Sequence, residues 1–252
     1  MANVLKVDSL SFSYVKRQVL DNISFELPSG SVTVVLGANG AGKSTLIKLL
    51  SGVYKTKIGK IVIADKDVSG LKQIDYAKLV SYVPQEPKFE SSTVIDAVLL
   101  GRLPFFTAPK KQDLEKVFEV LEKLDLSDFA MRDVTKLSGG EKQKVAVARS
   151  FASSADIIIL DEPTSGLDLK NKYSIIKIIK DLSKEGKTIL VSMHDVNEAL
   201  DIGDNYILLN KGSLVATGDK SVLTEDSLSQ VYDLEFHKVE HDGKTHFHIK
   251  EK

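Results

Sequence analysis

The first third of the chain alternates short apolar stretches with turn-forming residues. The apolar stretches lie at residues 4–7, 19–26 and 32–36, and turn-formers such as residues 28–30 (PSG) separate them. This spacing predicts β-strands. Residues 32–36 (VTVVL) form a continuous apolar run, which is typical of a strand buried on both faces. Residues 60–64 give another candidate strand.

Further along the chain, helical and strand patterns alternate. A helical pattern begins near Lys43, and apolar residues recur at helical spacing over residues 111–125. Apolar runs at 157–160 and 188–193 indicate buried parallel strands, each followed by a helix, and residues 206–209 add one more strand. Strands that alternate with helices predict an α/β fold with a mainly parallel sheet.

Composition and charge narrow the possible functions. The 252 residues are 42% hydrophobic and 27% charged, which is typical of a soluble globular protein. Because 34 Lys and Arg face 35 Asp and Glu, no basic excess supports nucleic-acid binding. The absence of cysteine excludes disulfides, thiolate metal sites and cysteine nucleophiles. No apolar run reaches the roughly 18 residues that span a bilayer, and the N-terminus lacks a signal-peptide layout. We therefore expect a cytoplasmic protein that reaches a membrane only through a partner.

Residues 37–44 (GANGAGKS) match the phosphate-loop pattern G-x-x-x-x-G-K-[ST] at every fixed position. Glycines let backbone N–H groups approach phosphate oxygens, and the following helix directs its positive end at the same anion. Lys43 is expected to reach the β- and γ-phosphates, and Ser44 to ligate Mg²⁺. A glycine-rich turn with nothing bound would not explain the Lys-Ser pair. The expected nucleotide-binding residues here are Gly37, Asn39, Gly40, Ala41, Gly42, Lys43, Ser44 and Thr45.

Two carboxylates follow the predicted strand at residues 157–160. The strand end delivers Asp161 to the Mg²⁺, and Glu162 can polarise a water molecule for attack on the γ-phosphate. Alone, such a pair usually means only a solvated strand end. Downstream of a phosphate loop, the catalytic interpretation is favoured.

Residues 137–143 (LSGGEKQ) have both a structural and a functional explanation. Ser138 and Glu141 fit a capping box. Capping alone does not require Gly139 and Gly140, which cost a helix start conformational entropy. Paired glycines at a helix N-terminus make a second anion site. We therefore expect a dimer in which this site closes on the γ-phosphate of ATP held by the other copy.

The ordered set of phosphate loop, LSGGEKQ and residues 159–163 (ILDEP) resembles the ATP-binding subunits of ABC transporters, over nearly the whole chain. The resemblance implies an ATPase with ATP and Mg²⁺ as cofactors. It also implies a P-loop ATPase core with a mainly parallel sheet, an N-terminal antiparallel β subdomain and an inserted α-helical subdomain. The implied division is 1–85 with 154–220 for the core and β subdomain, 86–153 for the helical subdomain, and 221–252 for a C-terminal helix and hairpin.

The resemblance assigns roles to further residues. Tyr14 corresponds to the aromatic that stacks on adenine, although it could be an ordinary strand aromatic that shares a face with Phe12. Gln85 corresponds to a glutamine that senses Mg²⁺, Asp168 to a loop that passes information across the dimer, and His194 to a histidine that contacts the γ-phosphate. The implied catalytic residues are Glu162, His194 and Gln85. The implied metal-binding residues are Ser44, Gln85 and Asp161. The implied nucleotide contacts outside the phosphate loop are Tyr14, Ser138, Gly139, Gly140 and Asp168.

Two kinds of ABC protein remain open: a separate importer subunit, or a soluble ABC ATPase that acts with a non-transporter scaffold, as in iron–sulfur cluster assembly. Residues 93–104 (TVIDAVLLGRLP) and 228–235 (LSQVYDLE) resemble importers of iron–siderophore, haem and cobalamin. This implies a subunit peripheral on the inner face of the cell membrane. Its implied partners are a second copy in an ATP-dependent head-to-tail dimer, a transmembrane permease and, indirectly, a substrate-binding protein. Phe105 and Phe106 could offer an apolar groove to the permease, or fill the helical subdomain's core.

The C-terminus contains His237, His241, His246 and His248, four of the five histidines. The Asp242-Gly243 dipeptide predicts a hairpin turn that pairs His237 with His248 and Val239 with His246. Directly paired residues share a face. All four histidines then lie on one face, and Phe236, Phe247 and Ile249 lie on the face that should pack on the domain. His237, His246 and His248 could bind a divalent ion, or form a solvated face that titrates near neutral pH.

Overall fold

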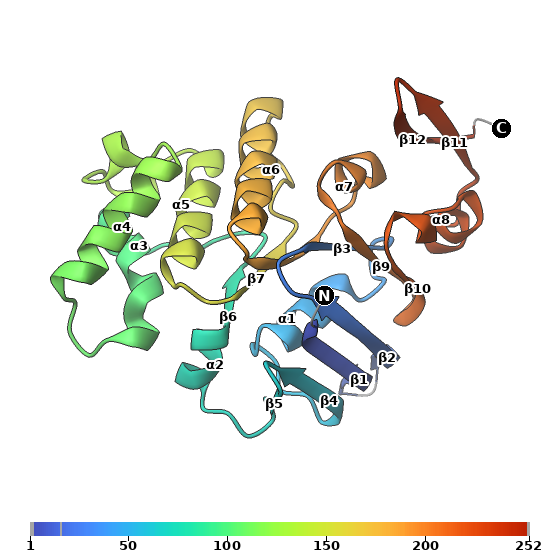
Figure 1. Ribbon diagram of the computed structural model, residues 1–252, viewed down its shortest axis with the longest axis horizontal. Helices are drawn as coiled ribbons and strands as arrows, with labels where there is room; N and C mark the ends of the chain where they lie inside the picture. The colour runs from blue at the N-terminus through green and yellow to red at the C-terminus, as the bar shows by residue number, and fades with distance from the viewer. Residues whose placement is uncertain (1–2, 16, 251–252) are drawn as a thin grey trace. The chain divides into compact units, whose positions relative to one another are not determined.

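The computed structural model describes residues 3–15 and 17–250 (Figure 1). The chain forms two compact units. The first unit consists of Met1–Leu71 and Ile179–Lys252, and the second of Lys72–Ile178. Helix α6 (Leu169–Lys184) begins in the second unit and ends in the first.

An antiparallel sheet opens the first unit, with the strand order β2-β1-β4-β5. Its strands are β1 (Asn3–Tyr14), β2 (Arg17–Pro28), β4 (Ile58–Ile63) and β5 (Lys66–Asp67). Along the end of β2, Ile23, Phe25 and Leu27 are buried while the residues between them are exposed. This period of two is the pattern of a sheet with one face on the core. The antiparallel β subdomain that the resemblance implied is therefore present.

A mainly parallel arrangement follows in the same unit. Strand β3 (Val32–Leu36) pairs in parallel with β8 (Thr188–Ser192) and β9 (Asn205–Asn210), and β10 (Ser213–Gly218) pairs antiparallel with β9. Every residue of β3 and β8 is buried. The continuous apolar run at 32–36 therefore forms the expected strand with both faces covered.

Helices α1 (Lys43–Leu50) and α7 (Val196–Ile202) follow β3 and β8. Each helix begins within a few residues of the end of its strand. The loops that lead into these helices therefore lie at the carboxyl ends of parallel strands, where α/β proteins usually bind their ligands.

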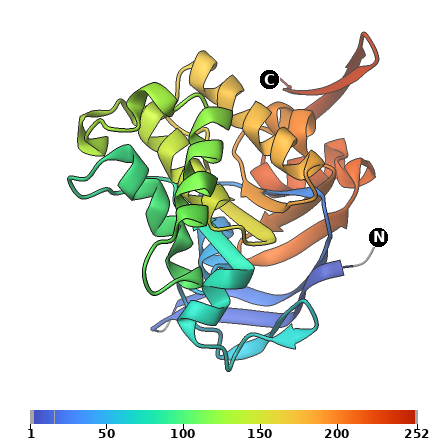
Figure 2. The ribbon, with the colours of Figure 1, turned by 60° about the vertical axis from the view of Figure 1, so that its left-hand side comes forward.

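The second unit combines a parallel strand pair with helices. Strand β6 (Val80–Val83) pairs in parallel with β7 (Ile157–Asp161). Helices α3 (Val94–Leu99), α4 (Lys111–Lys123) and α5 (Gly139–Ala152) pack side by side, as the green and yellow-green ribbons of Figure 2 show. The remaining elements are α2 (Gln73–Leu79) and the 3₁₀ helices η1 (Leu100–Phe105), η2 (Ser127–Phe129) and η3 (Val134–Lys136). The helix expected over 111–125 is thus confirmed, and it ends two residues earlier.

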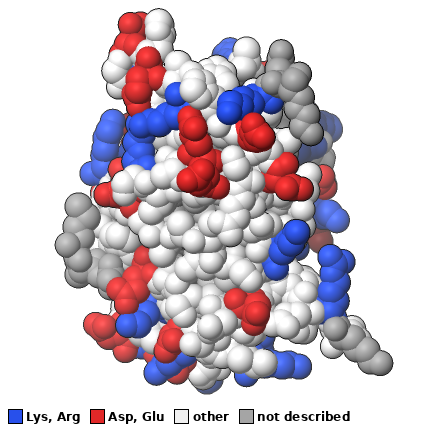
Figure 3. Space-filling view, turned by 90° about the vertical axis from the view of Figure 1, so that its right-hand side faces the viewer, with Lys and Arg blue, Asp and Glu red and all other residues white. Residues whose placement is uncertain are grey.

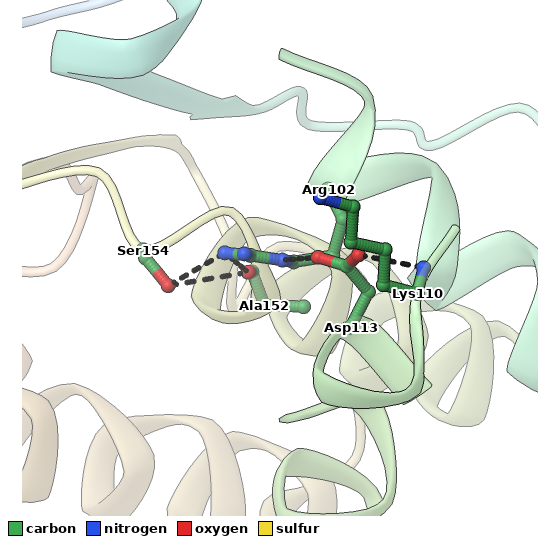
Figure 4. A network of polar contacts seen from close by, with 5 residues as sticks. All are labelled: Arg102, Lys110, Asp113, Ala152 and Ser154. Carbon is green, nitrogen blue, oxygen red and sulfur yellow. Dashed lines mark hydrogen bonds and ion pairs between the residues drawn. The ribbon is translucent and has the colours of Figure 1, made fainter. Parts of the chain in front are cut away.

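A partly buried polar network holds η1 against the end of α5 (Figure 4). Arg102 Nε donates to Asp113 Oδ1 at 3.0 Å, and Arg102 Nη1 donates to the Ala152 carbonyl at 3.2 Å and to Ser154 Oγ at 3.0 Å. The Lys110 backbone N–H, and to a lesser degree Arg102, hold the pKa of Asp113 below its usual range. The Arg102 guanidinium thus satisfies a carbonyl at the C-terminal end of α5.

The C-terminal segment consists of η4 (Lys220–Val222), α8 (Glu225–Tyr232), β11 (Phe236–His241) and β12 (Lys244–Ile249). The hairpin has the predicted register, with His237 opposite His248. Asp242 and Gly243 adopt φ angles of 49° and 73°, the left-handed conformations that a two-residue turn of this kind needs. Phe236 and Phe247 are buried as expected, whereas Ile249 on the same face is exposed.

Candidate functional site

The phosphate loop at residues 37–44 connects β3 to α1. Gly40 and Gly42 adopt φ angles of 80° and 103°, which favour glycine. A Cβ on Gly42 would stand 2.7 Å from Leu20 Cδ2, and a Cβ on Gly37 would stand 2.7 Å from the Leu209 carbonyl oxygen. Glycine is therefore favoured by conformation at Gly40, by space at Gly37, and by both at Gly42.

The Lys43 side chain folds back over the loop. Its ammonium donates to the carbonyl of Gly37 at 2.7 Å and to that of Ala38 at 3.3 Å. Lys43 is buried, although lysine is seldom buried unless it is paired. The loop therefore carries a fixed positive charge among backbone groups at the N-terminus of α1, where an anion is stabilised.

Tyr14 lies beside the start of α1. Its hydroxyl is 3.3 Å from Thr45 Oγ1. Its ring packs edge-on against Phe12 and Tyr54, with centroid distances of 5.0 and 5.8 Å. Phe12 and Tyr54 stack on each other with an interplanar angle of 5°. Three rings thus form one aromatic cluster next to the loop.

His194 lies between β8 and α7, in the same unit as the phosphate loop. The residue is exposed, and its backbone carbonyl accepts a hydrogen bond from the Tyr232 hydroxyl at 3.4 Å. Asp195 caps α7 by accepting from the N–H groups of Asn197 at 2.7 Å and Glu198 at 3.0 Å. The histidine is therefore presented by a loop with fixed ends.

Asp161 and Glu162 lie at the end of β7, in the second unit. Both residues are buried, and Glu162 is only 7% exposed. The backbone of Glu162 has a φ of 48°, a left-handed conformation that costs a non-glycine residue about 1–3 kcal/mol. Gln85 Nε2 donates to Glu162 Oε2 at 2.7 Å. Gln85 and Glu162, which sequence reasoning predicted separately, are thus in direct contact.

Residues 137–143 contain the beginning of α5 at Gly139. Glu141 Oε2 accepts from the Ser138 N–H at 2.7 Å, and Ser138 Oγ accepts from the Glu141 N–H at 3.3 Å, which completes the capping box. Ser138 Oγ also donates to Glu141 Oε2 at 2.7 Å, and this hydrogen bond, followed by the one from the Ser138 N–H, lowers the pKa of Glu141. Ser138 and Gly139 are both exposed.

The glycine pair of this segment has an explanation that sequence reasoning missed. A Cβ on Gly140 would stand 2.5 Å from the Asn171 side chain, whereas a Cβ on Gly139 would meet nothing within 4 Å. Asn171 is itself held by Asp168, which accepts from its N–H at 2.8 Å and from its Nδ2 at 3.2 Å. Packing against Asn171, in addition to the anion site, therefore favours a glycine at Gly140, whereas no contact within the chain does so at Gly139.

Comparison with known proteins identifies the family. The family model for ABC transporters matches residues 20–165. The chain belongs to the ABC transporter family. An uncharacterized ABC transporter ATP-binding protein of Methanocaldococcus jannaschii is 44% identical over 231 residues, which are 91% of this chain and 91% of that protein. A Helicobacter pylori protein named for iron chelatin transport is 36% identical over 248 residues, which are 96% of this chain and 97% of that protein.

A solved structure supports the same assignment. A chain described as part of an inward-facing, metal-chelate type ABC transporter is 31% identical to this ABC transporter subunit, with a TM-score of 0.85. The match covers 100% of this chain and 99% of the other. The α/β ABC ATPase fold is therefore confirmed, and the chain is an ATP-binding ATPase of a transport system.

The surface of this ABC ATPase carries both exposed apolar side chains and charged ones. Phe105 is 40% exposed and lies 4.8 Å from the Arg102 guanidinium, and Phe106 is half-buried, so the two rings do not simply fill a core. On the face drawn in Figure 3, basic and acidic side chains are interspersed. Among the described residues, no helix has the length and apolarity needed to cross a membrane.

The proposed metal site of the C-terminal histidines is not borne out. Over residues 3–15 and 17–250, no three His, Asp or Glu side chains form a group that could hold a metal ion. His237 Nδ1 instead lies 3.2 Å from Glu225 Oε1, and the side chains of both residues are well exposed. The solvated polar face is therefore the better description.

Residues that sequence reasoning did not find also adjoin the predicted site. Tyr54 completes the aromatic cluster of Tyr14, and Tyr232 reaches the carbonyl of His194. Neither residue belongs to a motif. Tyr232 lies in the LSQVYDLE stretch, which resembles importers but assigns no role to this tyrosine.

Proposed function

We propose that this chain hydrolyses ATP, with Mg²⁺, to power an importer of a metal chelate such as iron–siderophore, haem or cobalamin. The chain would act as a head-to-tail dimer that encloses two ATP molecules, bound peripherally to a transmembrane permease on the inner face of the membrane. A substrate-binding protein would deliver the cargo to that permease.

The observation that carries the proposal is the environment of Glu162. Its carboxylate is buried, its backbone is strained and Gln85 fixes one of its oxygens at 2.7 Å. A carboxylate held in this way can orient a water molecule and accept its proton as the water attacks the γ-phosphate. Strained, buried groups of this kind are concentrated at functional sites.

The remaining roles follow from the chemistry of each residue. Lys43 and the loop N–H groups would bind the β- and γ-phosphates, because they offer positive charge and closely spaced donors. His194, with an imidazole on a fixed loop, would contact the γ-phosphate. Tyr14 would stack on adenine from the edge of the aromatic cluster.

The oxygen donors fit a magnesium ion. Mg²⁺ prefers hard oxygen ligands and is commonly held by one or two protein groups together with substrate phosphates. The Ser44 hydroxyl and the Asp161 carboxylate are such donors, and the Gln85 amide oxygen is a third. When bound, the ion would neutralise charge on the phosphates.

The dimer is proposed from the second unit. Ser138 and Gly139 are exposed at the start of α5, and Asp168 caps the start of α6. On α6, Leu169 and Tyr173 are 85% and 71% exposed and one helical turn apart. Large apolar side chains exposed together indicate an interaction surface. These residues would contact the second copy, and Ser138 and Gly139 would meet its ATP.

The importer and its cargo are proposed from the relatives. The Helicobacter pylori relative is named for iron chelatin transport, and the structural neighbour is described as metal-chelate type. Both favour a metal-chelate importer over a cluster-assembly ATPase. The exposed Phe105 is proposed to contribute to the permease contact.

Replacement of Glu162 tests the hydrolytic role. Glu162→Gln keeps the size and the hydrogen-bonding partner, but it removes the basic carboxylate. Steady-state ATP hydrolysis should fall by about 10²-fold or more, while ATP affinity in a fluorescence titration stays close to that of wild type. ATP should then trap a dimer that is visible by size-exclusion chromatography. Near-normal turnover would show that another group acts as the base.

Replacement of Ser138 tests the shared site. Ser138→Arg places a bulky side chain at an exposed position, so nucleotide binding to the phosphate loop should persist while the ATP-dependent dimer and hydrolysis are lost. Lys43→Ala should lose the dimer because it loses nucleotide. Normal hydrolysis by Ser138→Arg would refute the shared-site arrangement.

Recovery of the native complex tests the transport class. Affinity purification of the full chain from native membranes should recover a polytopic membrane protein. Recovery of a cluster-assembly scaffold in its place would refute the importer assignment. Cells that carry Glu162→Gln should then fail to take up one of the three compounds iron–siderophore, haem and cobalamin, and the compound that is no longer taken up is the cargo.

A further inference from the structure

The C-terminal hairpin is joined to the helix that follows His194. Asn197 lies in the first turn of α7, three residues beyond His194. Its Nδ2 donates to the Phe247 carbonyl at 3.0 Å, and its Oδ1 accepts from the Phe247 N–H at 2.9 Å. One side-chain amide thus pairs with both backbone groups of a single residue in β12. Since the Phe247 ring is buried, this connection joins two packed elements.

The end of α8 reaches the other side of the same loop. The Tyr232 hydroxyl donates to the His194 carbonyl at 3.4 Å. Burial raises the pKa of the Tyr232 phenol, and the nearby backbone of Gly37 lowers it in part. Tyr232 packs against Phe236, the first residue of β11, with ring centroids 5.7 Å apart. Tyr232 therefore connects the His194 carbonyl, through its hydroxyl, to the first residue of β11, through its ring.

The loop that carries His194 is short. Strand β8 ends at Ser192 and α7 begins at Val196, which leaves three residues, with His194 in the middle. The position of the His194 Cα–Cβ bond, from which the imidazole extends, is therefore determined by how this short backbone is held. Asp195 fixes the start of α7, and Tyr232 contacts the carbonyl of His194 itself.

We propose that Asn197 and Tyr232 are positioning residues, through which α8 and the hairpin hold His194 in its orientation for ATP hydrolysis. The inference rests on the proposed role of His194 at the γ-phosphate. Asn197 acts through the backbone of α7, and Tyr232 acts through the His194 carbonyl. The loss of either contact changes the rate of turnover rather than the capture of ATP.

Two conservative variants of the full chain test the proposal. Tyr232→Phe removes the hydroxyl and keeps the ring against Phe236. Asn197→Asp keeps the acceptor for the Phe247 N–H and removes the donor to its carbonyl. A displacement of about 1 Å at a catalytic group can lower the rate about 10²-fold. The loss of one of the two contacts should displace His194 by less than this, so each variant should lower kcat about 10-fold. KM for ATP and ATP affinity should stay within about 2-fold. His248→Ala, on the exposed face of the same hairpin, is the matched control and should behave as wild type.

A structural measurement accompanies the kinetics. Hydrogen–deuterium exchange followed by mass spectrometry should show faster exchange in the peptide that contains His194 in both variants, and unchanged exchange there in His248→Ala. A merely structural role would instead lower the melting temperature and raise KM together with the fall in kcat. That result would overturn the proposal.

The His194→Ala variant separates failure of this inference from failure of the proposed function. If His194→Ala lowers kcat strongly while Tyr232→Phe and Asn197→Asp match wild type in both kcat and exchange, the positioning role is refuted and the hydrolytic role of His194 stands. If His194→Ala itself turns over normally, the proposed role of His194 is wrong, and the positioning role is refuted with it.

Discussion

The contact between η1 and α5 should make Gly101 intolerant of even one added methyl group. A Cβ built on Gly101 would stand 2.0 Å from the carbonyl oxygen of Arg149 and 3.0 Å from its carbonyl carbon. Non-bonded heavy atoms are most favourable at about 3.5–4.0 Å. Both partners are backbone atoms, so rotation of a side chain cannot relieve the overlap. Gly101→Ala must therefore move η1 and α5 apart by more than about 1 Å.

The expected cost follows from two opposing effects. Extra volume in a packed interior costs about 1–3 kcal/mol, and occasionally more. Gly101 is not among the glycines with positive φ, so alanine would otherwise stabilise the chain by about 0.4–1 kcal/mol. The net loss is then about 1–2 kcal/mol. Displacement of η1 also weakens the bonds from Arg102 to the end of α5, which adds to the loss.

Thermal unfolding followed by circular dichroism measures this effect. A loss of about 1–2 kcal/mol should lower Tm by about 2–8 °C in a chain of this size. The matched control is Gly139→Ala, in the same unit, where the new methyl meets nothing within 4 Å. Gly139 is the first residue of α5 and has no positive φ, so alanine fits there without strain and that variant should equal or exceed wild type in Tm. Equal Tm values for Gly101→Ala and wild type would refute the steric argument.

Three further predictions concern stability and metal binding. The folded-state pKa of Asp113 is lowered, so its contribution to stability is present above the unfolded pKa near 3.8 and is lost as the pH falls through the folded pKa. Asp113→Asn should therefore flatten the acid limb of a curve of unfolding free energy against pH. An unchanged acid limb would show that Asp113 does not stabilise the fold in this way. Phe247→Ala should lower the free energy of unfolding by about 3–5 kcal/mol in urea titrations, whereas Ile249→Ala should change it by less than about 0.5 kcal/mol, because the two side chains are 4% and 56% exposed. Calorimetric titration of Zn²⁺ should give equally weak binding for wild type and the His237→Ala/His248→Ala double variant, and micromolar binding lost in the double variant would restore the metal site.

Features encoded over a few neighbouring residues were predictable from the sequence. The strand at 32–36 has the predicted bounds because its four apolar residues occupy both faces of the strand, so that both faces of the sheet must be covered. The hairpin has the predicted register because an Asp-Gly turn leaves the two strands only one way to pair. The phosphate loop was recognisable because its glycines and Lys43 act within eight residues of one another.

Features that depend on contacts between distant residues were not predictable in this way. Asn197 and Phe247 are 50 residues apart, and Tyr232 and His194 are 38 apart. Neither pair leaves a periodic or compositional signal in the sequence. Arg102 was noticed only as part of a family-like stretch, and its contact with the end of α5 required the fold.

The signature segment shows how structure can separate stability from function at neighbouring residues. The capping box accounts for Ser138 and Glu141, and the close approach of Asn171 accounts for Gly140. Gly139 is exposed and has room for a side chain, so neither capping nor packing within the chain requires a glycine there. If the second copy's nucleotide approaches this backbone closely, alanine should abolish the ATP-dependent dimer while the isolated chain keeps its full Tm. If Gly139→Ala dimerises normally with ATP, the glycine is only tolerated and the shared site must be built from other groups.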